Sequence, residues 1–220
     1  MKNKTEQVEP DEIYRTLPLQ NIPWNIETPP DALVQLVQGG RIKPCKVIDF
    51  GCGAGNYAIY LASKGFDVTG VDISPRAIEF AKENAGRKNV KCHFIVADVL
   101  GDVGKNVNET FDFAYDWELL HHIYPENREK YVRNVHKVLA AGGKYFSVCF
   151  SEKDTEFGGS GKYRKTRLGT ILYFSSEKEL RDLFSRFFNI IELTTIEISG
   201  TTVSHFVNCA FMTKKEPEGD

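Results

Sequence analysis

A glycine-rich turn between an apolar run and a helical stretch is the feature that most constrains the fold of this 220-residue chain. Val47-Ile48-Asp49-Phe50 leads into Gly51-Cys52-Gly53-Ala54-Gly55-Asn56, and a second apolar run ends at Val71-Asp72. A strand, a glycine turn, a helix and a second strand closed by a carboxylate form a nucleotide-type site at the carboxyl edge of a parallel sheet. The pattern therefore predicts a binding site as well as a fold class.

The turn also narrows the kind of ligand. A dinucleotide-binding turn has glycine at its first, third and sixth positions, and here those are Gly51, Gly53 and Asn56. Asp49 places a negative charge where it would oppose a pyrophosphate and favour an ammonium or sulfonium group. A cationic ligand is the prediction.

The stretch from Val47 to Glu83 resembles the cofactor half of the class I S-adenosylmethionine-dependent methyltransferases. These enzymes carry acidic-x-Gly-x-Gly-x-Gly after the first strand and an acidic residue at the end of the second. By that resemblance the cofactor is S-adenosylmethionine, Asp72 takes its ribose hydroxyls, and Asp98 lies near its adenine amino group. The complete set of cofactor contacts that the resemblance implies is Asp49, Gly51, Cys52, Gly53, Gly55, Asn56, Asp72, Ile73, Asp98, Val99, Asp116 and Trp24.

Apolar runs rich in β-branched residues alternate with stretches of helical period along the chain. We expect strands at 46–50, 67–71, 91–97, 111–116 and 143–150, and helices at 56–63, 75–85 and 125–139. Two further runs, 188–198 and 203–213, predict a closing hairpin. The result is an α/β, Rossmann-like doubly wound sheet, mostly parallel with one antiparallel strand, as in the seven-stranded methyltransferase fold. We expect a single domain over 13–213, with a cap segment at 13–44 and flexible tails at 1–12 and 214–220.

Composition excludes some partners. The formal net charge of -2 gives no general attraction to nucleic acid or to an anionic membrane surface. No apolar run approaches a membrane span, and the five cysteines lack any Cys-x-x-Cys pair, so we expect reduced thiols and a cytoplasmic location. The scattered histidines predict no metal site. The oligomeric state is not determined.

Three residues at or just beyond the end of the fourth expected strand are candidates for catalysis: Asp116, His121 and His122. Strand alternation and the carboxyl-edge rule place Asp116 in the crevice beside the cofactor. His121 and His122 are the groups that titrate nearest neutrality, and as adjacent residues they cannot point the same way. We expect one imidazole to face the site and the other to cap or pack.

Two flanking segments could cover the site. Trp24 lies in an Ile-Pro-Trp segment that resembles one in thiopurine and thiol methyltransferases, although an aromatic plug on the sheet edge is equally compatible. The stretch 157–167 carries three glycines and the cations Lys162, Arg164, Lys165 and Arg167, which predicts a mobile basic lid. A solvated loop is the alternative.

These features predict an enzyme that methylates a small molecule, most similar to the thiopurine, thiol and tellurite-resistance methyltransferases. A thiol or chalcogen anion is the expected acceptor, because it needs little base catalysis. The alternatives are O- or N-methylation of a small metabolite and a regulatory protein that binds the cofactor without turnover. After the fourth expected strand the chain has Asp116-Trp117-Glu118-Leu119 in place of the Asn/Asp-Pro-Pro-aromatic motif of nucleic-acid methylation, which makes that activity less expected.

Overall fold

The computed structural model describes residues 8–158, 160–200 and 203–216. The ends of both expected tails, 1–7 and 217–220, lie outside the described residues. Helix α1 begins at Pro10, inside the segment expected to be a tail, and its Ile13 and Tyr14 are buried. The ordered part of the chain thus starts earlier than the sequence indicated.

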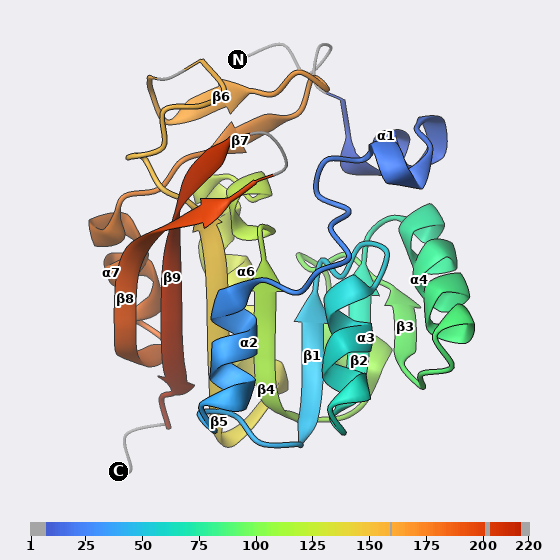
Figure 1. Cartoon of the computed structure of the whole chain (residues 1–220). Helices are drawn as coiled ribbons and strands as arrows, with labels where there is room; N and C mark the ends of the chain where they lie inside the picture. The colour runs from blue at the N-terminus through green and yellow to red at the C-terminus, as the bar shows by residue number, and fades with distance from the viewer. Residues whose placement is uncertain (1–7, 159, 201–202, 217–220) are drawn as a thin grey trace.

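The centre of the molecule is a seven-stranded sheet in the order β3-β2-β1-β4-β5-β9-β8, and β6 and β7 form a separate two-stranded sheet (Figure 1). The neighbours from β3 to β5 pair in parallel, whereas β9 is antiparallel to both β5 and β8. The single antiparallel strand and the closing hairpin are both confirmed. The strands are β1 (Lys46–Phe50), β2 (Asp67–Asp72), β3 (His93–Val96), β4 (Phe111–Trp117), β5 (Leu139–Phe150), β6 (Tyr163–Lys165), β7 (Ile171–Tyr173), β8 (Phe188–Ser199) and β9 (Ser204–Lys214).

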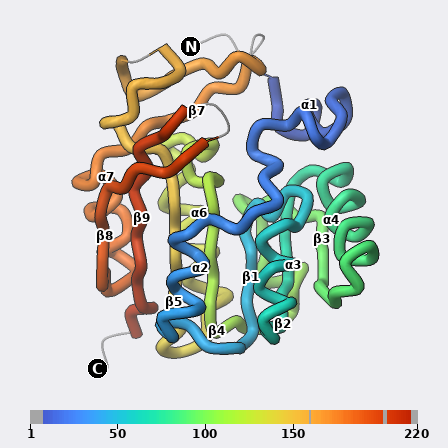
Figure 2. The backbone as a smooth tube through the Cα atoms, viewed as in Figure 1, coloured from blue at the N-terminus to red at the C-terminus, as the bar shows by residue number. Residues whose placement is uncertain are grey.

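Helices cover both faces of the sheet (Figure 2). Buried side chains of α2, α3 and α4 pack on one face, and those of α5, α6 and α7 pack on the other. The fold is therefore a three-layer α/β sandwich, as the sequence predicts. The helices are α1 (Pro10–Thr16), η2 (Leu19–Asn21), α2 (Asp31–Gln38), α3 (Asn56–Ser63), α4 (Pro75–Arg87), α5 (Val103–Val107), η3 (Leu120–His122), α6 (Pro125–Val138) and α7 (Glu177–Phe184).

The local sequence explains the helix starts nearest the site. Pro75 opens α4 with its fixed φ, and the Ser74 hydroxyl accepts the Ala77 N–H at 3.1 Å. Ser176 and Glu179 form a capping box at the start of α7. Because these caps fix the chain where it leaves the sheet, they position the loops at its carboxyl edge.

None of the helices in the described part of the chain combines the length and apolar character needed to cross a bilayer. The five cysteines, all within that part, carry no disulfide.

Candidate functional site

The glycine turn follows β1 at the carboxyl edge, where β1 lies between β2 and β4. Gly51, Gly53 and Gly55 all have positive φ, at 72°, 52° and 77°. A Cβ on Gly51 would come within 2.9 Å of the Leu119 side chain, and one on Gly55 within 2.8 Å of the Phe94 ring. Glycine is therefore required for both the backbone conformation and the packing of this turn.

Asp72 lies at the end of β2 beside that turn. Its carboxylate accepts the Gly53 N–H and the Ser74 N–H, both at 2.9 Å. Burial raises the pKa of this carboxyl, and the two backbone hydrogen bonds lower it. Each oxygen keeps acceptor capacity, so the geometry is compatible with a ligand diol.

Two apolar side chains beside Asp72 are left open to solvent. Ile73 is 56% exposed and Val96, at the end of β3, is 46% exposed. Asp98 is exposed and accepts the Leu100 N–H at 2.8 Å, whereas the Val99 side chain lies in the core. This edge thus presents an apolar surface next to a carboxylate, which suits a flat heterocycle, and Val99 can offer a ligand only its backbone.

Asp49 lies under the turn, only 3% exposed, and accepts the Tyr115 hydroxyl at 2.7 Å. Burial raises its pKa to about 7. Cys52 is partly buried, and burial raises the pKa of its thiol. Asp49 does not face solvent in this structure, so it could act on a ligand only through its charge.

The N-terminal segment folds over the turn. The Tyr14 hydroxyl, on α1, lies 2.6 Å from the position that a Cβ on Gly53 would take, and it accepts the Trp24 indole N–H at 2.9 Å. Asn56 donates to the Asn25 side chain at 2.9 Å and so anchors the same segment. The Trp24 segment therefore covers the glycine turn, as the cap hypothesis requires.

The prediction that Asp116 reaches the crevice is wrong. Asp116 is fully buried on the α6 side of the sheet, where it accepts the hydroxyls of Tyr131 at 3.0 Å, Ser147 at 3.2 Å and Tyr145. Burial raises its pKa to about 6, against these hydrogen bonds and one from the Leu120 backbone. Strand alternation sends residue 116 to the face opposite its neighbours, so Asp116 positions the following loop and does not contact a ligand.

Sequence reasoning missed Glu118, two residues later. It has a positive φ of 64°, which is unusual for a residue with a side chain, and its N–H donates to the Val148 carbonyl at 2.8 Å. Burial raises the pKa of this partly buried carboxyl to about 7. No sequence signal marks such a conformation in a non-glycine residue, although the position directly after β4 could have drawn attention.

The two adjacent histidines have different surroundings. His121 is 2% exposed and its ring stacks on Phe150 at 4.5 Å between centroids. His122 is partly exposed and lies edge-on to Trp24 at 6.4 Å. Burial lowers the pKa of His121 and takes that of His122 to about 4, so both rings are neutral near pH 7. His121 packs, and His122 faces the segment that covers the site.

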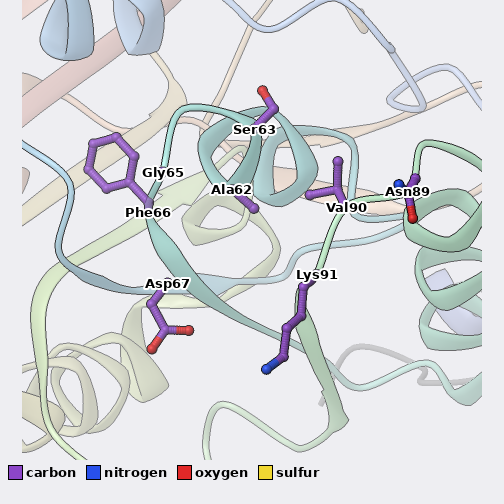
Figure 3. Close-up of a pocket in the computed structure, with 8 residues that line it drawn as sticks. All are labelled: Ala62, Ser63, Gly65, Phe66, Asp67, Asn89, Val90 and Lys91. Atoms are coloured by element: carbon purple, nitrogen blue, oxygen red, sulfur yellow. The ribbon is translucent and has the colours of Figure 1, made fainter.

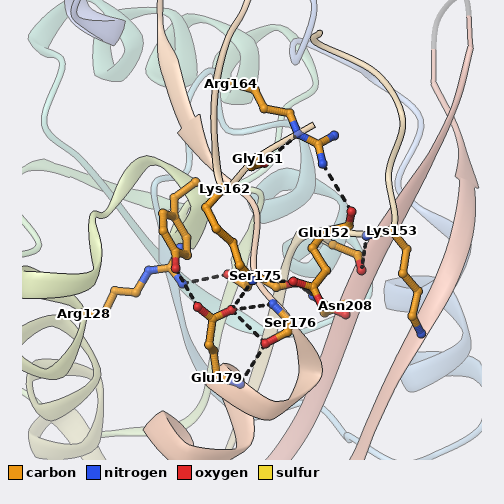
Figure 4. Close-up of polar contacts among 12 residues, drawn as sticks. Arg128, Glu152, Lys153, Gly161, Lys162, Arg164, Ser175, Ser176, Glu179 and Asn208 are labelled. Carbon is orange, nitrogen blue, oxygen red and sulfur yellow. Dashed lines mark hydrogen bonds and ion pairs between the residues drawn. The ribbon is translucent and has the colours of Figure 1, made fainter. Parts of the chain in front are cut away.

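The expected basic lid is a folded hairpin whose main cations are already paired (Figure 4). Arg164 is 4% exposed and donates to the carbonyls of Gly161, Asp154, Glu156 and Glu152 at 2.5 to 3.2 Å. Lys162 pairs with Glu152 and Glu179. The expectation of a free basic lid is wrong for these two residues, and only Lys165 and Arg167 remain exposed.

The carboxyl edge shows the opposite charge balance. No ion pair within the described residues involves Asp49, Asp72, Asp116 or Glu118. Asp49 is buried and Asp72 and Glu118 are partly buried, and holding such carboxyl groups out of water without a cation is unfavourable in the free protein. A positively charged ligand such as a sulfonium would supply the missing charge.

A depression in the surface lies elsewhere (Figure 3). It is lined by the end of α3, the start of β2 and the loop before β3, with Asp67 and Lys91 at its rim. This is the amino edge of the parallel strands, where the fold does not place ligands. The glycine turn remains the candidate site.

Comparison with known proteins agrees with this geometry. Residues 47–143 match the model of a methyltransferase domain. The chain is 28% identical over 173 residues to the 2-heptyl-1-hydroxyquinolin-4(1H)-one methyltransferase of Mycobacteroides abscessus, covering 78% of this chain and 70% of that protein. It is 30% identical over 114 residues to the probable S-adenosyl-L-methionine-dependent methyltransferase TehB of Haemophilus influenzae, covering 51% of this chain but only 38% of TehB.

A solved structure described as "Conversion of a Disulfide Bond into a Thioacetal Group during Echinomycin Biosynthesis" has a TM-score of 0.77 at 26% identity, covering 93% of this chain and 91% of that one. The crystal structure of TehB from Haemophilus influenzae shares the fold, with a TM-score of 0.67 at 20% identity over 87% of this chain and 64% of that one. Together with the glycine turn that ends beside Asp72, these matches support a class I S-adenosylmethionine-dependent methyltransferase that resembles the tellurite-resistance group.

Proposed function

We propose that the protein transfers the methyl group of S-adenosylmethionine to a hydroxyl or ring nitrogen of a small planar heteroaromatic molecule. The observation that carries the proposal is a continuous series of ring contacts at the carboxyl edge. Trp24 contacts His122 at 6.4 Å, His122 contacts His121 at 4.7 Å, and His121 stacks on Phe150 at 4.5 Å. Offset and edge-on aromatic contacts favour a flat partner.

The series continues away from the glycine turn. Phe150 contacts Phe157 at 5.6 Å, and Phe157 stacks on His205 at 5.4 Å with 3° between the ring planes. Because the imidazoles of His121 and His122 are neutral near pH 7, this series of rings carries little charge of its own. The M. abscessus relative, named for a hydroxyquinolinone, supports an acceptor of this shape.

In this arrangement the chain contributes binding and alignment. Asp72 would accept the ribose hydroxyls, Ile73 and Asp98 would contact the adenine, and the Gly51–Gly55 backbone would hold the methionine part. Trp24 and Tyr14 would exclude water from the displacement. S-adenosylmethionine supplies the activated methyl group, and an in-line displacement needs chiefly correct alignment from the protein.

A thiol or chalcogen anion is the second candidate acceptor. The structure described in terms of converting a disulfide bond into a thioacetal group favours it. The paired state of Lys162 and Arg164 weighs against it, because those cations had been expected to attract the anion.

The five unpaired cysteines support a reducing compartment such as the cytoplasm.

The test is transfer of a labelled methyl group from S-adenosylmethionine to a panel of acceptors. The panel contains hydroxyquinolinones and other hydroxylated heteroaromatics, small thiols, selenide, tellurite and halides. We expect the highest kcat/KM with the heteroaromatic acceptors. Turnover confined to thiols or chalcogen anions would overturn the first proposal in favour of the second.

A further inference from the structure

Glu118 is placed where β4 meets the glycine turn. In the sheet register Phe50, the last residue of β1, is opposite Asp116, and the side chain of Leu119 lies against Gly51. Glu118 is between these two contacts in the chain. It therefore borders the turn that would hold the methionine part, on the side toward the acceptor edge of β4 and β5.

The backbone of Glu118 is held in a conformation that a side chain disfavours. Its φ is 64°, and the hydrogen bond from its N–H to the Val148 carbonyl fixes it between β4 and β5. Strained conformations of this kind persist where the surrounding structure imposes them, and they are concentrated at functional sites. The observed strain directs attention to what the side chain does there.

No cation within the described residues pairs with this carboxyl. The titratable group that interacts with it is Tyr57 from α3, whose pKa the Glu118 charge raises. Tyr57 brings no positive charge, and His122, four residues further along the chain, is neutral near pH 7. Burial raises the pKa of Glu118 to about 7. Glu118 is thus a partly buried carboxyl with free acceptor capacity beside the site.

We propose that Glu118 accepts the proton that the acceptor loses during methyl transfer, an inference that rests on the proposed O- or N-methylation. The acceptor's oxygen or nitrogen forms a bond to the methyl carbon, and the carbon–sulfur bond breaks with its electron pair going to sulfur. The acceptor proton moves to a carboxylate oxygen of Glu118. The positive sulfonium and the negative carboxylate both become neutral in one step.

This neutralisation has a physical advantage in a covered site. The sulfonium stabilises the ionised form of Glu118 before the reaction, and its loss afterwards favours the protonated form. Two opposite charges in a low-dielectric environment are thereby replaced by two neutral groups without an external base. The same exchange of charge would not be needed for an acceptor that is already an anion.

The test compares Glu118→Gln with Glu126→Gln, a matched change at an exposed position on α6. Initial rates are measured between pH 6 and 9 with a hydroxylated heteroaromatic acceptor and with a thiol above its own pKa. Binding of S-adenosylhomocysteine is measured by calorimetry, and folding by circular dichroism. Glu118→Asp, which keeps the carboxylate, is the conservative variant.

With the hydroxylated acceptor we expect Glu118→Gln to lower kcat by ~100-fold or more and to remove the rise of kcat with pH below neutrality. With the thiolate the loss in kcat should be much smaller. The affinity of Glu118→Gln for S-adenosylhomocysteine should stay within about twofold of the wild type, because the partner of the carboxylate is the sulfonium, which S-adenosylhomocysteine lacks. Glu118→Asp should restore part of the rate. Equal losses with both acceptors, or none with the first, would overturn the role of Glu118 alone. A wild-type protein that methylates only thiols would overturn the proposed function together with it.

Discussion

The carboxyl edge of the sheet and the segment from 152 to 179 treat charge in opposite ways. In the segment, Arg164 and Lys162 find carbonyls and carboxylates within the protein. At the edge, Asp72 accepts backbone N–H groups, and neither Asp72 nor Glu118 has a cation as partner in the described part of the chain. In the segment the charged groups stabilise the protein's own structure, whereas at the carboxyl edge the negative charge is left for a ligand to balance. Mutations in the two regions should therefore differ in kind.

The largest expected effect is on stability, from Arg164→Ala. The buried guanidinium donates to four backbone carbonyls and lies 3.9 Å from the Phe174 ring centroid. Its removal leaves the buried carbonyl acceptors without their donor and takes the guanidinium away from Asp154, so we expect a loss of about 3 kcal/mol or more in unfolding free energy. Urea denaturation measures it. Lys165→Ala, at the exposed neighbour, is the control, and a similar loss there would contradict the contrast.

At the carboxyl edge the corresponding change should affect binding first. Asp72→Ala removes the proposed ribose acceptor, and we expect S-adenosylhomocysteine to bind more weakly by roughly 1.5 to 3 kcal/mol, more than tenfold. Asp67→Ala, at the exposed opposite end of β2, is the matched control for calorimetry. Unchanged affinity in a folded Asp72 variant would remove Asp72 from the cofactor site.

The uncompensated carboxyls also predict a dependence of binding on pH. The pKa values of Asp49 and Glu118 are raised to about 7, so below neutrality these groups are mostly protonated and must release protons before they can balance a cation. S-adenosylmethionine should therefore bind more tightly at pH 7.5 than at pH 6, by up to about tenfold for each group.

Calorimetry in buffers with different ionisation enthalpies should detect the released protons. The same shift makes the free protein less stable as pH rises through 7, because a raised folded-state pKa stabilises the protein only below it. The histidines oppose this trend below pH 6.5, since the pKa of His122 is lowered to about 4. Binding that strengthens on acidification would contradict the assignment of a cationic ligand to this edge.

The smallest expected effect is a gain in stability from Glu118→Gly. Glycine adopts the positive φ of 64° without a steric penalty, so we expect the free energy of unfolding to rise by about 1 kcal/mol. Glu118→Ala keeps the strain and should show no such gain. Thermal unfolding of the three proteins measures the difference, and a destabilised glycine variant would show that the side chain supports the fold.

Most of the fold followed from local pattern. The strands expected at 46–50 and 67–71 are β1 and β2 to within one residue, because period, β-branching and the glycine turn act over short distances. The strand expected at 143–150 begins earlier, as β5 at Leu139, and its additional residues include a shift in its register with β4. The β6–β7 hairpin was missed because three-residue strands carry almost no periodic signal.

The cofactor half of the site was predictable because its chemistry depends on backbone conformation and one carboxylate, and the sequence spells out both in Gly51–Gly55 and Asp72. The half of the site that would bind the methyl acceptor was not predictable from the sequence. Whether a charged side chain is free or paired depends on which distant segments meet it, as Arg164 meets Asp154 and Asp116 meets Tyr131. By itself the sequence determined the fold class and the cofactor. Only the tertiary structure decided that Asp116 faces inward and that Glu118 borders the site with no ion-pair partner among the residues described.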